Sequence, residues 1–243
     1  MGHLVELETT GGTIPAYRAD PEGAPRGAVI VIHEIWGLVG HIQDVADRFA
    51  GEGYLAVAPD ILTNAGLPPE LGAELQALIQ RGDDVTRSEA QPRLREKLGV
   101  TRSPEYAEWA ITVLAQVVDY VAAQHGGEEP IAVVGFCFGG SYAYAVAAED
   151  TRVSRVVPFY GEAPAFATLG DIRGRVLAFY GEKDERITGK LPELRTAMAE
   201  SGVDFTPVVY PGVGHAFFND TNPAAYDEET AADAWRRTLD FLA

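Results

Sequence analysis

The most reactive side chain in the sequence is its single cysteine, Cys137, in the stretch Gly135-Phe136-Cys137-Phe138-Gly139. β-Branched residues precede this stretch, and small residues and tyrosines follow it as in a helix, so the pattern matches a G-x-S-x-G turn with cysteine in place of serine. Glycines suit so tight a turn because side chains there would clash with the neighbouring strand and helix. The N–H groups and dipole of the following helix favour a thiolate. We therefore predict that Cys137 is a nucleophile, the alternative being a small buried hydrophobe.

Two further side chains could complete this chemistry, because such a nucleophile needs a general base and an acid that orients the base. Asp184 follows the apolar run VLAFYG and His215 follows the run TPVVYPG, so both should lie at the carboxyl ends of strands. The order nucleophile, acid, histidine is the one that accompanies this turn. We predict a triad of Cys137, Asp184 and His215, the alternative for Asp184 being a turn residue.

The other histidines and a rival acid fit these roles less well. Asp60 follows a strand but precedes the cysteine, which breaks the expected order, and His33 ends a strand, where packing explains it. The remaining histidines are peripheral or begin a helix: His3, His125 and His41.

The stretch HEIWG, residues 33–37, closes the strand where this kind of fold supplies a second oxyanion donor. We predict that the backbone N–H groups of Ile35 and Phe138 hold the oxyanion, each lowering the barrier by about 3–4 kcal/mol. Glu34 is either a surface acid of an acidic protein or a partner of Cys137, and the residues alone leave both possibilities open.

The elements that must position these residues alternate between strand and helix for most of the chain. Alternating polarity around Gly11-Gly12 predicts an N-terminal hairpin of residues 4–10 and 13–19. Apolar runs predict further strands at 27–34, 54–62, 131–135, 153–161, 175–184 and 204–212. Helical spacing predicts helices at 41–53, 104–125, from the cysteine turn to 148, 190–201 and 223–242.

This order of elements predicts an α/β fold with a mostly parallel sheet, helices on both faces and an antiparallel N-terminal hairpin. Active sites in such sheets lie beyond the carboxyl ends of the strands. We expect residues 1–243 to form a single domain. The segment 63–103 is rich in charge and proline, so we interpret it as a helical insertion or lid with short helices at 69–80 and 88–98.

Composition narrows the class of protein. The formal net charge of −17, from 36 acids and 19 bases, argues against nucleic acid and anionic membranes as partners. The sequence has no apolar run near the roughly 20 residues of a membrane span, no signal-peptide pattern and no pair of cysteines, so we expect a cytoplasmic protein. It also has no ligand cluster with zinc spacing, so we expect no metal and no cofactor.

Taken together, HEIWG, GFCFGG, the aspartate after the late strand, GHAF and the C-terminal LDFLA resemble the dienelactone hydrolase family over nearly the whole chain. The resemblance implies an α/β-hydrolase fold with a Cys-His-Asp triad. It also implies that Glu34 contacts Cys137 in the resting enzyme and takes the thiol proton once substrate binds.

The sequence departs from the family after His215. Ala216 and Asn219 occupy the places of the family's serine and of the arginine that holds the substrate carboxylate, so the carboxylated dienelactone itself is in doubt. An arginine of the insertion could reach the site instead: Arg81, Arg87, Arg93 or Arg95. A less charged ester or lactone would suit aromatic substrate-binding candidates, for which ordinary packing is the alternative: Trp36, Tyr160, Phe217 and Phe218.

The prediction is a hydrolase that cleaves a small-molecule ester or lactone through an acyl-thioester on Cys137, as a monomer or small homo-oligomer. Cysteine suits an activated ester because the thiolate is itself a good leaving group. The tetrahedral intermediate therefore forms the thioester only when the alcohol or enol of the substrate is a better leaving group than the thiolate. The alternatives are a broad-specificity carboxylesterase or thioesterase, and a non-catalytic protein that binds small molecules or senses oxidants through its thiol.

Overall fold

The computed structural model describes residues 1–81, 83–124, 130–163 and 166–243. Its centre is an eight-stranded sheet with the order β1-β2-β4-β3-β5-β6-β7-β8. The strands β1 and β2 form an antiparallel hairpin, β2 pairs with β4 antiparallel, and the pairs from β4 to β8 are parallel. The strands are β1 His3–Thr9, β2 Gly12–Ala19, β3 Ala28–Ile32, β4 Leu55–Pro59, β5 Ile131–Phe136, β6 Val153–Phe159, β7 Arg175–Gly181 and β8 Phe205–Tyr210.

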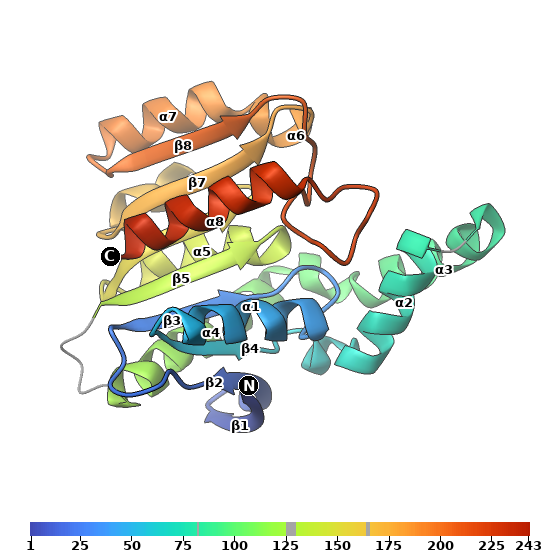
Figure 1. Ribbon diagram of the computed structural model, residues 1–243, viewed down its shortest axis with the longest axis horizontal. Coiled ribbons are helices and arrows are strands. Elements are labelled where there is room, and N and C mark those ends of the chain that lie inside the picture. Colours follow the sequence, from blue (N-terminus) through green and yellow to red (C-terminus); the bar gives the residue numbers. More distant parts are fainter. Residues whose placement is uncertain (82, 125–129, 164–165) are drawn as a thin grey trace.

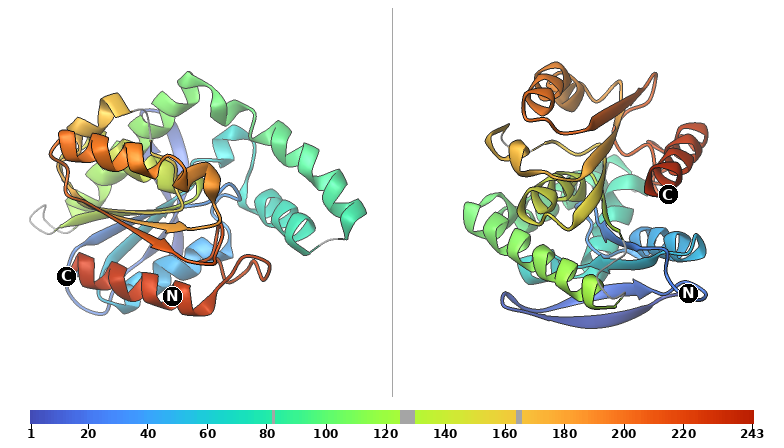
Figure 2. Two further views of the ribbon diagram at one scale, coloured as in Figure 1. Left: turned by 90° about the horizontal axis from the view of Figure 1, so that it is seen from above. Right: turned by 90° about the vertical axis from the view of Figure 1, so that its left-hand side faces the viewer.

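Helices cover both faces of this sheet, as Figures 1 and 2 show. On one face α1 (Gly40–Gly51) and α8 (Glu228–Leu242) pack against the strands, and on the other face lie α4 (Pro104–Gln124), α5 (Phe138–Glu149) and α7 (Leu191–Glu200). Each face has its own apolar core. Residues of β3 and β5 are buried on both faces, which is why these strands appear as continuous apolar runs. The predicted fold, an α/β-hydrolase sheet with an antiparallel N-terminal hairpin, is confirmed.

The segment after β4 is helical, as predicted. It contains the 3₁₀ turn η1 (Thr63–Ala65), the helices α2 (Pro69–Arg81) and α3 (Asp84–Lys97), and the turn η2 (Val100–Arg102). Figure 1 shows α2 and α3 on the side toward which the parallel strands point. The insertion therefore lies on the same side of the molecule as the carboxyl ends of those strands.

Several predicted boundaries are wrong for local reasons. Helix α3 begins at Asp84 rather than 88, because the Asp83 side chain accepts a hydrogen bond from the Thr86 N–H at 2.8 Å and caps it. Helix α8 begins at Glu228 rather than 223, because Asp227 caps it in the same way through Thr230 at 2.9 Å.

Other differences are additions or shorter elements. Strand β3 ends at Ile32, two residues before the predicted end. The sequence did not predict the short helix α6 (Glu185–Thr188) or the 3₁₀ helix η3 (Phe166–Asp171). Among the described residues, no helix is both long and apolar enough to cross a membrane.

Candidate active site

Cys137 lies at the turn between β5 and α5, as the sequence predicted. Its backbone has φ 54° and ψ −111°, a conformation that L-residues rarely adopt, and the N–H of Phe138 begins the helix. A Cβ atom on Gly135 would lie 2.0 Å from the Gly139 oxygen, and one on Gly139 would lie 2.2 Å from the Ile32 oxygen. Glycine is therefore required on both sides of the cysteine, because strand and helix leave no room for a side chain.

His215 and Asp184 come from the loops that follow β8 and β7, and the structure brings them together. The Nδ1 atom of His215 lies 2.5 Å from Oδ2 of Asp184. Burial lowers the pKa of His215, but hydrogen bonds and charge interactions with Asp184 and Cys137 outweigh it and raise the pKa to about 10. The imidazole thus binds its proton more tightly than a free histidine does.

Two backbone N–H groups are available for an oxyanion. Ile35 and Phe138 line the same cavity as Cys137, and neither N–H donates a hydrogen bond to any described residue. The Phe138 N–H is the first of α5, so it belongs to the positive end of the helix dipole. This is the arrangement that stabilises negative charge on a carbonyl oxygen under attack.

Backbone strain is concentrated at this site. Tyr160 and Ala216, with φ of 40° and 62°, share with Cys137 a positive φ without being glycine. Tyr160 directly follows β6, and Ala216 directly follows His215. Such conformations cost of order 1–3 kcal/mol each and occur where function needs a side chain in a fixed place.

Glu34 is not a surface acid, because only 3 % of the residue is exposed. Burial raises the pKa of its carboxyl group, and nearby donors and positive charges partly offset that rise. Tyr160 donates to Oε1 at 3.3 Å and Asn219 donates to Oε2 at 2.5 Å. The resting contact that the family resemblance implies is therefore not a hydrogen bond here: Glu34 shares a cavity with Cys137 but bonds to other residues.

The rival acid and histidine have structural roles. Asp60 accepts hydrogen bonds from the N–H groups of Leu62 and Thr63 at 2.8 and 2.9 Å, which fixes the turn after β4. His33 is fully buried, donates from Nδ1 to the Glu34 carbonyl oxygen at 2.7 Å and accepts from the Ile61 N–H at 3.1 Å. Burial lowers the pKa of His33, so its ring is neutral.

The remaining histidines are His41, His3 and His125, and of these His41 lies near the site. His41 is buried and its Nδ1 lies 3.1 Å from Asp220, while its Nε2 has no hydrogen-bond partner among the described residues. It also acts electrostatically on Glu34, a contribution to the site that its position at a helix start did not reveal. His3 lies in the edge strand β1, and His125 lies outside the described residues.

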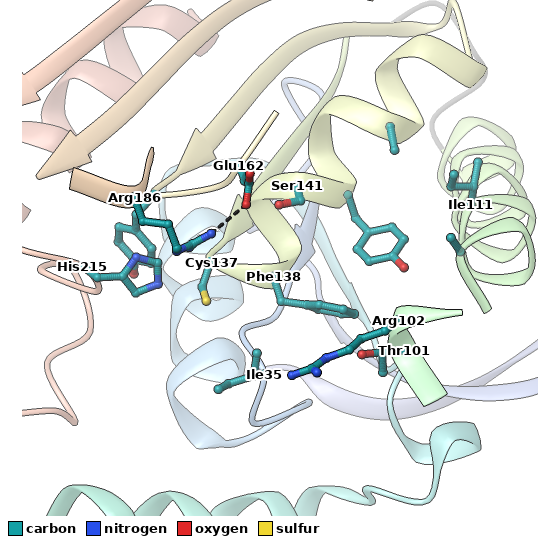
Figure 3. A pocket seen from close by; sticks show the side chains of 14 residues that line it. Ile35, Thr101, Arg102, Ile111, Cys137, Phe138, Ser141, Glu162, Arg186 and His215 are labelled. Atoms are coloured by element: carbon teal, nitrogen blue, oxygen red, sulfur yellow. Dashed lines mark hydrogen bonds and ion pairs between the residues drawn. The ribbon is translucent and has the colours of Figure 1, made fainter. Parts of the chain in front are cut away.

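Two cavities meet at the nucleophile. The first, of about 580 Å³, contains Ile35, Cys137 and His215 and continues along α5 and α4. Figure 3 shows the Cys137 sulfur facing the space between His215, Phe138 and Ile35. The walls beyond are apolar or aromatic: Ala107, Ile111, Phe138, Tyr142 and Ala145.

The second cavity, of about 510 Å³, shares Ile35, Cys137 and His215 with the first but is more polar elsewhere. Its polar side chains come from three parts of the chain: Glu34, Gln80, Arg87, Asn219 and Asn222. The helix α2 contributes Ile79 and Gln80, so the insertion borders the site. A carbonyl at Cys137 would have space on both sides.

The four aromatic candidates separate into two pairs. Trp36 lines the second cavity and Tyr160 lines the first. Phe217 and Phe218 are 0 % and 2 % exposed, line neither cavity, and pack in the core beneath α1 and α8. The structure thus does not bring Phe217 and Phe218 to the cavities, and the packing alternative describes their place.

The arginines at the cavities are mostly not those expected. Arg87 lines the second cavity, but Arg93 pairs with Glu74 at 2.9 Å. The first cavity holds Arg102 and Arg186 instead, and Arg186 bonds Glu162 at 2.7 Å. Arg95 lines neither cavity, and the side chain of Arg81 lies outside the described part of the chain. Within the described residues, no group of three His, Cys, Asp or Glu side chains could hold a metal ion.

Known proteins are similar to the chain over nearly its whole length. The model of the dienelactone hydrolase family matches residues 14–243. A relative from Saccharolobus solfataricus, provisionally named a carboxymethylenebutenolidase, is 34% identical over 266 residues, covering 100% of this chain and 98% of its own. A crystal structure of a provisionally named dienelactone hydrolase from Klebsiella pneumoniae has a TM-score of 0.82 and 30% identity, covering 100% of this chain and 98% of its own.

A more distant structure shows the fold alone. A cold-adapted esterase from an Arctic intertidal metagenomic library has a TM-score of 0.64 and 20% identity, covering 100% of this chain and 94% of its own.

Proposed function

The chain belongs to the dienelactone hydrolase family, and we propose that it cleaves an uncharged or weakly charged ester or lactone through a thioester on Cys137. The observation that carries the proposal is the 2.5 Å contact between His215 and Asp184 beside a cysteine on a strained strand–helix turn. A binding protein would have no need for an oriented histidine at the thiol.

In the proposed acylation, the Cys137 thiolate attacks the carbonyl carbon. The carbonyl π electrons move to oxygen, where the N–H groups of Ile35 and Phe138 hold the negative charge. The intermediate collapses, the carbon–oxygen bond to the leaving group breaks, and the His215 imidazolium gives its proton to the departing oxygen. The product of this step is a thioester on Cys137 and a free alcohol or enol.

Deacylation reuses the same residues. Once Cys137 is acylated its negative charge is gone, so one of the interactions that raises the pKa of His215 is lost. The neutral imidazole can then accept a proton from water, and the resulting hydroxide attacks the thioester. Collapse expels the Cys137 thiolate, which leaves the carboxylic acid and the starting enzyme.

The thiol proton must leave before attack, and we assign this step to Glu34. Its carboxylate lies in the second cavity with Cys137, and its burial raises the pKa, which makes it a better proton acceptor than a surface acid. Since His215 already holds the proton that it gives to the leaving group, Glu34 is the acceptor that remains for the thiol proton.

The two cavities support an assignment of the substrate's ends. The apolar part of the first cavity, along α4 and α5, suits the acyl group, and the second cavity suits the leaving group, with α2 as its cover. Space on both sides of Cys137 also favours a second candidate, a carboxylesterase or thioesterase that accepts open-chain substrates.

The test is hydrolysis of p-nitrophenyl esters, thioesters and a dienelactone by the parent, Cys137→Ser and His215→Ala. We expect both variants to lose most turnover, and the preferred substrate to separate lactonase from esterase or thioesterase. If both variants hydrolyse every substrate at the parent rate, the catalytic proposal is wrong. Peroxide-dependent change at Cys137 without ester turnover would instead support a thiol sensor.

A further inference from the structure

Asn219 is fully buried and its side-chain amide has a defined orientation. Its Oδ1 atom accepts two hydrogen bonds from Thr221, from the backbone N–H at 3.0 Å and from the hydroxyl at 2.6 Å. A backbone N–H can only donate, so the atom that it meets must be the oxygen of the amide. The Nδ2 group therefore faces Glu34, whose Oε2 lies 2.5 Å away.

The bonds continue from Thr221 to the insertion. The Nε2 group of Gln76, on α2, donates to the Thr221 hydroxyl oxygen at 3.1 Å, and Gln76 is only 8 % exposed. The hydroxyl accepts this bond and gives its own proton to Asn219. Hydrogen bonds thus run in one direction from Gln76 to Thr221, from Thr221 to Asn219, and from Asn219 to the Glu34 carboxylate.

We propose that Asn219, held by Thr221 and Gln76, is a positioning residue that fixes the Glu34 carboxylate and favours its ionised form. The inference rests on the proposed function, in which Glu34 accepts the thiol proton. It adds that the insertion helix α2 is connected to this proton acceptor through an unbroken series of hydrogen bonds.

The physical reason is the conflict between burial and charge at Glu34. Burial favours the protonated acid, which has no capacity to take another proton, whereas a hydrogen bond donated to the carboxylate favours the anion. Donors that are themselves hydrogen-bonded in the same direction polarise one another and strengthen the last bond. Asn219 therefore keeps the pKa of Glu34 lower than burial alone would set it.

Asn219 also occupies the place where the family resemblance expects an arginine for the substrate carboxylate. Its amide nitrogen is directed to Glu34 and its oxygen to Thr221, so the side chain serves the proton acceptor rather than a substrate. An arginine there would place a full charge beside Glu34, whereas the asparagine supplies a neutral donor.

The elements that pack against Glu34 bring other titratable or charged groups close to it. The substitutions of Asn219 and Thr221 described below leave these groups in place. Tyr160 donates to Oε1, His41 on α1 and His215 act through their charge, and His33 bonds the Glu34 backbone. Cys137 and Arg87 line the same cavity. A shift that follows Thr221→Val, which adds no charge, can therefore be assigned to the Thr221 hydroxyl, whereas Asn219→Asp combines loss of the donor with a second negative charge.

The experiment measures the burst-phase acylation rate with p-nitrophenyl acetate as a function of pH. Asn219→Asp keeps the shape of the side chain but removes the donor and adds a second acid. Thr221→Val removes the hydroxyl alone. We expect the acidic limb of the profile to move to higher pH in both, by about one unit or more for Asn219→Asp, which is roughly tenfold slower acylation below the limb. Thr221→Ser, which keeps the hydroxyl, should return the profile to that of the parent.

Two controls separate positioning from general damage to the fold. In a Glu34→Gln background, Thr221→Val should have no further effect on acylation, because the group on which it acts is gone. Glu74→Gln, which breaks an ion pair between α2 and Arg93, should leave the profile unchanged.

The inference would be overturned if the substitutions lowered the acylation rate equally at all pH values. It would also be overturned if Thr221→Val lowered the rate by the same factor with and without Glu34. Loss of the Cys137 requirement itself would instead contradict the proposed function, so the two failures are distinguishable.

Discussion

The imidazole Nδ1 of His215 lies 2.5 Å from the Asp184 carboxylate, and His215 lines both cavities together with Cys137. His215 and Asp184 are 31 residues apart in the sequence and lie in the loops after two adjacent parallel strands, β8 and β7. Asp184 thus holds the imidazole in one orientation and stabilises its protonated form, as the proposed triad requires.

The first prediction concerns that acid. Burial lowers the pKa of His215, and the bonds with Asp184 and Cys137 raise it to about 10, so Asp184→Asn should lower it. A less basic imidazole stabilises less of the Cys137 thiolate, which is the form that iodoacetamide alkylates. We therefore expect the alkylation rate at neutral pH to fall by up to about tenfold, since one pKa unit corresponds to a factor of ten. The exposed acid Asp204, paired with Arg175, provides the charge-matched control Asp204→Asn. Equal alkylation rates in both variants would contradict the assigned role of Asp184.

The second prediction concerns the shape of the acyl cavity. Ala145 of α5 and Ile111 of α4 line its apolar part, and Figure 3 shows Ile111 on the far side of the cavity from Cys137. Ala145→Phe should fill that part, so kcat/KM should fall for p-nitrophenyl hexanoate and change little for the acetate. Each methylene excluded from an apolar site costs about 0.8 kcal/mol, or roughly fourfold. An equal change for both esters would show that the acyl chain lies elsewhere.

Stability should respond to Glu34 in a way that depends on pH. Burial raises the pKa of this carboxyl above its usual 4.5, so the folded protein binds the proton more tightly than the unfolded chain does. Its contribution to the free energy of unfolding is therefore lost as pH rises through the folded value. We expect the free energy of unfolding of Glu34→Gln, measured in urea, to rise relative to that of the parent as the pH is raised from about 5 to about 8. Acylation by this variant should be slower than in the parent. The same difference in unfolding free energy at both pH values would argue against a destabilising charge at this position.

The glycines of the cysteine turn give a fourth prediction. A Cβ atom on Gly139 would lie 2.2 and 2.6 Å from the Ile32 and His33 carbonyl oxygens, so Gly139→Ala should displace the turn and remove most activity. Gly51, at the end of α1, has open space for a Cβ atom. Gly51→Ala should therefore keep activity and be neutral or stabilising by up to about 1 kcal/mol. Retained activity in Gly139→Ala would show that the turn tolerates a side chain.

The sequence predicted those parts of the molecule that local patterns determine. Cys137 lies between required glycines, and Asp184 and His215 each follow an apolar strand, so chain order was enough to predict that the three residues lie at the same edge of the sheet. The sheet followed from alternation of strand and helix. Helix starts at Asp84 and Glu228 were misplaced because capping by Asp83 and Asp227 decides them, not apolar spacing.

Contacts between distant parts of the chain could not be predicted in this way. Glu34 and Asn219 are separated by 185 residues, and no pattern around either residue shows that they are hydrogen-bonded. The same limit applies to Arg102, which reaches the first cavity from the turn after α3. Phe217 looked like a cavity residue because it is near His215, but the positive φ of Ala216 accompanies its burial in the core.

The most direct test of the account is the mass of the protein during turnover of p-nitrophenyl acetate, quenched in acid and followed by peptide mapping. Catalysis through a thioester on Cys137 predicts one acetyl group on the peptide that contains Cys137 and no adduct in Cys137→Ala. The acylated fraction should be larger in His215→Ala if deacylation is slowed more than acylation. Ester hydrolysis by Cys137→Ala at the parent rate, or an acetyl group on another residue that turns over with the substrate, would contradict it.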